Sequence, residues 1–190
     1  MFQLSYSSMD LFCRDKKAWI RKYVHGEEQF VTPQMKFGKR FAEAMEHREE
    51  EHGDDIEMIK PLIPDYKERE LKVYKVFEGK EFVGILDGWS PKKIGEYKTG
   101  KLWNQNMVDQ SEQITFYAWL LDCPEYQPSE EMELTWVETK TEDGFVSFTG
   151  RVETFQTKRS RAQIDLMGRR AVRMYDEMLS VWETEATKNI

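Results

Sequence analysis

The sequence predicts a mixed α/β fold, with a central mixed β-sheet of about five strands flanked by helices. Segments in which apolar residues recur at helical spacing alternate with shorter segments of strand character, in the order α, α, β, β, β, α, β, β, α. One predicted helix crosses between the third and fourth strands. A helix in that position favours a mixed sheet with helices on both of its faces.

Chain length and composition indicate the domain organisation. The chain has 190 residues, of which 39% are hydrophobic, which is enough for one domain with a substantial core and short for two. We therefore expect a single domain over residues 1–190. Its apolar runs are far shorter than the roughly 20 residues of a membrane-spanning helix, and the N-terminus lacks a signal-peptide pattern. A soluble cytoplasmic protein without membrane contact is expected.

Two helices are predicted in the first fifty residues. Apolar side chains at roughly helical spacing indicate a first helix from about Ser8 to Val24, and a second helix begins after Pro33. The second helix fades near Glu49, within the acidic run 46–57. That run fits either a frayed helix end or a loop.

The following segment has strand character, and its turns contain glycine or proline. Three consecutive antiparallel strands are predicted, then a helix that Pro124 stops, then two strands joined by a turn, and finally a long helix. These elements cover residues 70–77, 81–90, 93–99, 106–122, 132–140, 144–152 and about 158–183.

Charge is unevenly distributed along the chain. The formal net charge of −7 by itself argues against nucleic acid as a partner, because phosphate binding depends on clustered Lys and Arg. Basic residues nevertheless gather in segments 14–22, 36–40 and 158–173, whereas acidic residues gather in 46–57 and 130–143. Two interpretations remain open, a basic groove on an acidic body or ordinary solvated helix faces.

Three charged residues, Asp87, Glu96 and Lys98, lie close together in the segment GILDGWSPKKIGEYKTG. Strand geometry puts Glu96 and Lys98 on one face, and symmetric pairing about the Pro91 turn would set Asp87 opposite Glu96, at roughly 5 Å between Cβ atoms. Two carboxylates at that range repel each other, and a hard divalent cation such as Mg²⁺ or Mn²⁺ relieves the repulsion. The lysine would hold a water or hydroxide and offset charge on a scissile phosphate.

These residue types are also common on solvated hairpins, so the pattern has a purely structural alternative. The context favours a site, because Asp87 follows the apolar run FVGIL and Glu96 follows Ile94 and Gly95, where burial is expected. Charged residues rarely occupy such positions without a partner or a function.

The segments GILDG and IGEYKTG resemble the core motif of the PD-(D/E)XK nuclease superfamily, and in particular its RecB-like exonuclease branch. In that branch G-x-x-D precedes an apolar strand that ends in (D/E)-x-K-T-G. Gln113 and Tyr117 match the Q-x-x-x-Y helix motif of the branch, and they share one helix face. The N-terminal segment LSYSSMDLFCRDKKAWIRKY is similar to its opening Ser-x-Ser helix. The resemblance runs from Leu4 to about Leu121.

This resemblance implies a restriction-endonuclease-like core and assigns roles to residues of the strands. Asp87 and Glu96 match the metal-binding acids of the family, and Lys98 matches its catalytic lysine. The backbone carbonyl of Tyr97 would complete the metal shell, as its counterpart does in relatives.

The match is less complete on the helices. Gln113 and Tyr117 match residues that position the active site or DNA, and packing within the core is the alternative for both. Against the helix motif G-x-x-x-H-x-x-x-E, the segment GKRFAEAME has Gly38 and Glu46 in place, but Ala42 stands where the histidine is expected. That histidine binds metal in many relatives. We therefore expect a site of carboxylates, with Glu46 as a further candidate ligand, and an inactivated site is the alternative.

The resemblance also bears on the cofactor. CRISPR-associated members of the branch hold an iron–sulfur cluster with four cysteines, and Cys13 matches the first of these. The C-terminal cysteines are absent, since the only other cysteine is Cys123. We expect Mg²⁺ or Mn²⁺ as the cofactor and no iron–sulfur cluster.

Candidate DNA-binding residues follow the motif and occupy the C-terminal helix. They are Lys101, Arg159, Arg161, Arg169, Arg170 and Arg173. The arginines would reach DNA phosphates, or else form the solvated face of a helix packed on the core. Trp89 and Trp103 would stack on unpaired bases or pack in the interior.

These features together predict a Mg²⁺- or Mn²⁺-dependent DNA nuclease that hydrolyses phosphodiester bonds, with single- or double-stranded DNA ends as substrate. By analogy with the family, we expect an exonuclease of phage or mobile-element type that acts in recombination, repair or DNA processing, with a recombination protein as a candidate partner. Two alternatives remain. One is a DNA-binding module with the nuclease fold and weakened catalysis, and the other is a structural subunit of a recombination or replication complex.

Overall fold

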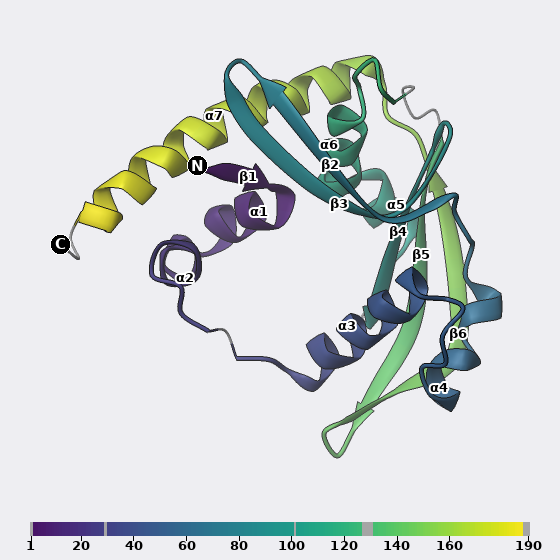
Figure 1. Cartoon of the computed structure of the whole chain (residues 1–190). Helices are drawn as coiled ribbons and strands as arrows, with labels where there is room; N and C mark the ends of the chain where they lie inside the picture. The colour runs from purple at the N-terminus through teal and green to yellow at the C-terminus, as the bar shows by residue number, and fades with distance from the viewer. Residues whose placement is uncertain (1, 29, 101, 127–130, 188–190) are drawn as a thin grey trace.

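The computed structural model describes residues 2–28, 30–100, 102–126 and 131–187, and these residues form one mixed β-sheet with helices on both faces (Figure 1). The strands of the sheet are β1 (Gln3–Ser5), β2 (Glu68–Phe77), β3 (Lys80–Ser90), β4 (Lys93–Gly100), β5 (Glu131–Glu142) and β6 (Phe145–Thr157). The helices are α1 (Tyr6–Arg14), α2 (Lys16–Trp19), α3 (Pro33–Glu46), α4 (Asp54–Glu57), α5 (Gln105–Asp109), α6 (Glu112–Leu120) and α7 (Arg161–Ala186), with a π-helical turn η1 (Ile20–Val24) and a 3₁₀ turn η2 (Lys60–Leu62). The mixed α/β class that the sequence predicts is confirmed.

The strand β3 contacts three other strands, and the sheet forks along one of its edges. β2 pairs with β3 antiparallel over nearly its whole length. β1 pairs in parallel with residues 81–83 and β4 pairs antiparallel with residues 88–90, so both lie along the other edge of β3. Residues 84–87 of β3 pair with neither of them. The sheet then continues through β5, parallel to β4, to β6, antiparallel to β5.

The connections between strands follow from simple geometry. Parallel pairing of β4 with β5 requires a crossover, and α5 and α6 provide it, as the sequence predicts. The β2–β3 hairpin turns at Glu78 and Gly79, whose φ angles of 50° and 71° are those of a type I′ turn. The β3–β4 hairpin turns at Pro91 and Lys92, with φ of 70° at Lys92, as in a type II turn. Both turns lie where the sequence predicts them.

Two hydrophobic cores occupy the opposite faces of the sheet. In the first, α1, α2, α6 and α7 pack against the strands around fully buried side chains that include Trp19, Phe82 and Trp136. In the second, α3 and α4 pack around Phe41 and Ile56. Figure 1 shows α3 and α4 together, separate from α6 and α7. Helices therefore cover both faces, as expected.

Tyr66 lies directly over a pair of glycines on the second face. A Cβ atom at Gly88 would lie 2.0 Å from Tyr66 Cδ2, and one at Gly95 would lie 2.1 Å from Tyr66 Cζ. The Tyr66 hydroxyl donates to Glu133 Oε1 at 2.5 Å, and the same buried carboxylate pairs with Lys93 at 2.9 Å. The glycines are needed because the aromatic ring occupies the space of a side chain.

The first predicted helix, over residues 8–24, is divided in the structure. α1 ends at Arg14, because Asp15 adopts an extended backbone with φ of −151°. The Asp15 side chain accepts a hydrogen bond from Ala18 N at 2.9 Å and so caps α2. A side chain that caps a new helix competes with continuation of the old one.

The predicted helix over residues 106–122 is also divided. α5 ends at Asp109, and Ser111 caps α6 by accepting from Ile114 N. Strand β1 was not predicted, so the sheet has six strands where about five were expected. β1 has only three residues, too few for an alternating pattern to show in the sequence.

The acidic run 46–57 ends in an ordered turn of helix. α4 buries Ile56, and the side chain of Lys60 is also buried. Lys60 Nζ donates to the carbonyls of Arg48, at 3.3 Å, and Glu50, and it pairs with Glu57 at 2.6 Å. The lysine therefore holds the loop against α4.

The long helix α7 joins the two ends of the described chain. The Tyr175 hydroxyl donates to the carbonyl of Phe2 at 2.8 Å, and Figure 1 shows α7 running beside β1. Within the described residues, no helix combines the length and the apolar character needed to cross a membrane.

Candidate active site

The fork in the sheet places Asp87 beside the neighbouring strand β4. Gly88 pairs with Gly95, so Asp87 and Glu96 are the next residues along the two strands, as symmetric pairing about the Pro91 turn predicts. The strands separate at this level. In place of a backbone hydrogen bond to β3, Tyr97 N donates a hydrogen bond to the side-chain oxygen Oδ2 of Asp87 at 2.6 Å. The Asp87 carboxylate thus takes the place of a backbone acceptor.

The two faces of β4 carry the residues predicted for them. Ile94 lies in the first core and Tyr97 lies in the second. Because successive side chains alternate between faces, Glu96 and Lys98 are on the side of the first core, where α6 packs. Glu96 is 2% exposed, whereas the Lys98 side chain is 30% exposed. The Glu96 carboxylate is therefore shielded from solvent, whereas the Lys98 ammonium group remains accessible to it.

The strand β3 departs from regular alternation at Asp87. Leu86 belongs to the first core, whereas a Cβ at Gly88, two residues on, would meet Tyr66 of the second core. In a regular strand these two positions would share a face. The neighbouring strand is irregular at the same level, since Glu70 has a φ of 49°. The regular alternation of side chains is therefore interrupted where Asp87 lies.

A chain of polar contacts runs from β4 to α6. Lys98 Nζ forms an ion pair with Glu96 Oε1 and donates to Gln113 Oε1 at 3.0 Å. Gln113 Nε2 in turn donates to the Tyr117 hydroxyl at 3.0 Å. The other carboxylate oxygen of Glu96, Oε2, is buried and has no hydrogen-bond partner among the described residues. A buried carboxylate oxygen without a donor is costly and points to a missing ligand.

The electrostatics of the cluster follow from burial and like charge. Burial, and then the charge of Glu96, raise the pKa of Asp87 well above its ordinary value. Burial lowers the pKa of Lys98, but Glu96 and Asp87 outweigh that effect, so the pKa of Lys98 is raised. Lys98 is therefore protonated at neutral pH. A bound metal cation would relieve the repulsion between Asp87 and Glu96.

Two further carboxylates lie nearby: the charge of Glu70 acts on Asp87, and the charge of Glu46 acts on Glu70. Burial, and then the charges of Glu46 and Glu96, raise the pKa of Glu70 on β2. Glu46, at the end of α3, is exposed and lies 3.7 Å from His47. The sequence interpretation named Glu46 but missed Glu70. A signal for Glu70 was available, because symmetric pairing about the turn at Glu78 places it opposite Asp87.

The donor set suits a hard divalent cation, although the side chains are not gathered round one point. Among the described residues, no three His, Cys, Asp or Glu side chains are arranged to hold a metal ion. The buried free oxygen of Glu96 and the repulsion between Asp87 and Glu96 nevertheless fit a cation with a preference for oxygen. To complete its coordination shell, an ion at this site would need water molecules, a backbone carbonyl or further carboxylates that move towards it.

The candidate DNA-binding arginines are placed in different environments. Arg161 pairs with Asp122 and Asp165, at 2.7 and 2.8 Å, and Arg170 pairs with Glu112. Arg169 and Arg173 are exposed on α7, and Lys101 lies outside the described residues.

Arg159 has a structural environment. Its guanidinium donates to the carbonyls of Val108, at 2.8 Å, and Ser111, at 3.1 Å, and to the hydroxyls of Thr115, at 2.7 Å, and Thr157, at 2.6 Å. It therefore satisfies carbonyls at the junction between α5 and α6.

Arg159→Ala is expected to lower the free energy of unfolding by about 2–3 kcal/mol, because several hydrogen bonds to a charged, half-buried donor are lost. Arg169→Ala, on the exposed face of α7, should change it by less than about 0.5 kcal/mol. Urea denaturation of both variants measures the difference, and equal stability of the two would refute the structural role of Arg159.

The two tryptophans near the motif pack against neighbours. The rings of Trp89 and Tyr126 meet edge to face, with 5.6 Å between centroids, and Trp89 Nε1 is buried without a partner among the described residues. Trp103 is partly buried against the first core. These contacts favour the packing interpretation for both side chains.

Two surface hollows differ in their position relative to the candidate catalytic residues. One contains Tyr117 together with Ser5, Tyr6, Ser7 and Lys72, so it adjoins the polar chain that ends at Lys98.

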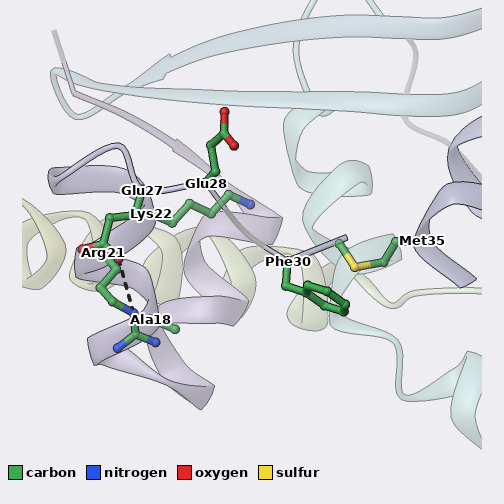
Figure 2. Close-up of a pocket in the computed structure, with 7 residues that line it drawn as sticks. All are labelled: Ala18, Arg21, Lys22, Glu27, Glu28, Phe30 and Met35. Carbon is green, nitrogen blue, oxygen red and sulfur yellow. Dashed lines mark ion pairs between the residues drawn. The ribbon is translucent and has the colours of Figure 1, made fainter. Parts of the chain in front are cut away.

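The other hollow lies between η1 and the start of α3 and contains none of the candidate catalytic residues (Figure 2). Its walls carry Lys22 and Arg21, which pairs with Glu27 at 3.9 Å, and the largely exposed ring of Phe30.

The fold and this cluster define a class of structure, a forked mixed sheet with acids and a lysine at the fork. The sequence matches no protein-family model and no curated protein at a significant level. Solved structures do share the fold. A candidate exonuclease from Eubacterium rectale aligns with a TM-score of 0.56 at 10% identity, over 99% of this chain and 82% of that chain.

A second solved structure, a phage-related exonuclease from Haemophilus somnus 129PT, aligns with a TM-score of 0.50 at 15% identity, over 84% of this chain and 78% of that one. Similarity at such low identity shows a common fold.

Proposed function

We propose that this chain is a divalent-metal-dependent DNA nuclease that hydrolyses phosphodiester bonds at the cluster of Asp87, Glu96 and Lys98. The observation that carries the proposal is the fork between β3 and β4, which brings two repelling carboxylates and one cationic lysine together around a buried, unpartnered oxygen. The fold shared with proteins named as exonucleases supports the same activity.

In this proposal Asp87 and Glu96 hold the ion, with the carbonyl of Tyr97 and Glu46 as further candidate ligands. A bound Mg²⁺ or Mn²⁺ would lower the pKa of a coordinated water and neutralise charge on the scissile phosphate. The residues of the chain supply the rest. Glu96 keeps Lys98 protonated, and Gln113 fixes the direction of the ammonium group by accepting a hydrogen bond from it. Lys98 then orients the nucleophilic water and offsets charge on the phosphate.

Substrate binding is expected on the side where the first core meets the fork. Tyr117 lies at the end of the polar chain from Lys98 and lines a surface hollow that also contains Lys72, a candidate contact for phosphate. The exposed Arg169 and Arg173 are further candidates, whereas Arg159 is occupied within the fold. We propose linear DNA as the substrate. From the family resemblance we also propose exonuclease action and a role in recombination, repair or DNA processing, as in a phage or mobile element.

The native chain is expected to degrade end-labelled linear DNA in the presence of Mg²⁺ or Mn²⁺. Chelation of the metal with EDTA should stop the reaction, because the carboxylates alone cannot generate a nucleophile at neutral pH. Single-stranded and double-stranded substrates are tested separately by gel electrophoresis of the labelled products.

The contrary result is equally specific. Binding of DNA by the native chain, measured by fluorescence anisotropy, without cleavage at any Mn²⁺ concentration would support the non-catalytic binding module. A circular substrate serves as the control for the requirement of an end, because an enzyme that needs an end should leave it intact.

A further inference from the structure

A third strand, β2, carries a carboxylate at the level of the fork. Arg69 pairs with Gly88 and Leu71 pairs with Leu86, so Glu70 and Asp87 are the residues between these pairs. On the other side of Asp87, the next position of β4 is Glu96. Glu70, Asp87 and Glu96 therefore form a row across three neighbouring strands at the fork. The sequence motif includes two members of this row, and Glu70 is outside it.

The backbone at Glu70 is unusual for its residue type. Its φ of 49° lies in the left-handed region, which glycine, asparagine and aspartate adopt far more readily than glutamate. No turn accounts for this conformation, because Glu70 lies inside the strand β2, Glu68–Phe77. Strained backbone of this kind persists where surrounding structure holds it, and it is concentrated at functional sites.

The Glu70 side chain also lacks a compensating partner. It is partly buried, and no hydrogen bond or ion pair joins it to any described residue, whereas Arg69 beside it binds Asp65 and Glu49. The charges that act on Glu70 are the carboxylates of Glu46 and Glu96. A partly buried carboxylate among like charges destabilises the fold unless a cation joins it.

The unpartnered oxygen of Glu96 gives independent support for a cation site at the fork. Glu96 is 2% exposed, and its Oε2 has no donor within the described residues, although the same carboxylate acts on both Asp87 and Glu70. Three carboxylates and one ammonium group leave an excess of negative charge that one divalent cation would neutralise. Their oxygens are the ligands that Mg²⁺ and Mn²⁺ prefer.

We infer that Glu70 is a further acidic residue of the divalent-cation site, and that its carboxylate contacts the ion directly or through one bound water. Three observations carry this inference: the row of carboxylates, the left-handed backbone of Glu70 and the unpartnered oxygen of Glu96. The inference rests on the proposed metal-dependent activity and adds a residue to it. The irregular backbone at Glu70 then has a function, since it positions this carboxylate at the fork where a regular strand would continue the ladder.

The test compares Glu70→Gln with Glu68→Gln, a control on the same strand at an exposed position. Thermal unfolding of the full chain is followed while Mn²⁺ is titrated, and DNA cleavage is not needed for the readout. Glu70→Gln should weaken the apparent affinity for Mn²⁺ by about 10-fold or more. In EDTA the same variant should unfold at a higher temperature than the native chain, because a like charge has been removed. Glu68→Gln should behave as native in both conditions.

The outcomes separate this inference from the proposed function. If Mn²⁺ stabilises the native chain and Glu70→Gln equally, Glu70 is not part of the site, while the proposed nuclease activity stands. If Mn²⁺ does not stabilise the native chain and supports no cleavage, both fail. Glu70→Asn serves as a second variant, because asparagine tolerates left-handed backbone, and it should lose Mn²⁺ affinity in the same way.

Discussion

Asp87→Asn is expected to reduce DNA cleavage by at least about 100-fold and, in the absence of metal, to stabilise the fold. The substitution removes a charged metal ligand but keeps the shape of the side chain. Asparagine Oδ1 can still accept the hydrogen bond from Tyr97 N, so the strand geometry is retained. The repulsion between Asp87 and Glu96 is lost, and stability gained at the expense of activity is typical of active-site charges.

The stabilising effect of Asp87→Asn should depend on pH in a definite direction. The pKa of Asp87 is raised in the folded state, so the folded protein binds this proton more tightly than the unfolded chain does. The contribution of Asp87 to the stability of the native chain therefore falls as the pH rises above about 4, the ordinary pKa of aspartate, through the folded-state pKa. In EDTA, the advantage of Asp87→Asn should be large at neutral pH and vanish below about pH 4.

The experiment combines a cleavage assay in Mn²⁺ with thermal unfolding in EDTA. Asp143→Asn is a matched control, because Asp143 is exposed at a hairpin turn with φ of 50°, which asparagine also adopts. The control should keep native activity and stability. Undiminished cleavage by Asp87→Asn would place the reaction elsewhere in the molecule.

Gly88→Ala is expected to destabilise the fold by about 3 kcal/mol. The new methyl group would lie 2.0 Å from Tyr66 Cδ2, far inside van der Waals contact. The ring cannot move aside at low cost, because the Tyr66 hydroxyl binds the buried Glu133 at 2.5 Å. Relief therefore requires either a shift of the strand or the loss of that hydrogen bond.

The matched control for Gly88→Ala is Gly38→Ala in helix α3. A Cβ at Gly38 would lie 3.3 Å from Thr99 Oγ1, a tight but tolerable contact, and alanine favours the helix by about 1 kcal/mol over glycine. Chemical denaturation should give a change within about 1 kcal/mol for the control. If Gly88→Ala were as stable as native, Tyr66 would not be fixed over the glycine pair.

Much of the fold could be predicted because its signals are local. The strand alternation around Glu96, the turn at Pro91 and the start of α3 at Pro33 each depend on residues close in sequence. The three-residue strand β1 pairs with residues 81–83, which lie 78 residues further along the chain, and nothing in its own sequence indicates that pairing. The breaks at Asp15 and Ser111 show that a capping side chain can outweigh helical periodicity.

The candidate site could be predicted only where the motif is linear. Asp87, Glu96 and Lys98 are brought together by one hairpin, so their spacing carries the information. The involvement of Arg159 with backbone carbonyls of α5 and Ser111 is a tertiary contact that sequence spacing does not report. Glu70 was missed because it lies outside the linear motif, although symmetric pairing about the turn at Glu78 places it opposite Asp87. Its left-handed backbone is seen only in the structure.

We propose that a divalent cation binds at the fork between β3 and β4. Crystals of the native chain grown with Mn²⁺ test it directly, because manganese gives an anomalous diffraction signal that locates the ion. We predict one strong peak next to Asp87 and Glu96. Manganese bound elsewhere, or absent from the fork at a concentration that supports DNA cleavage, would contradict this account.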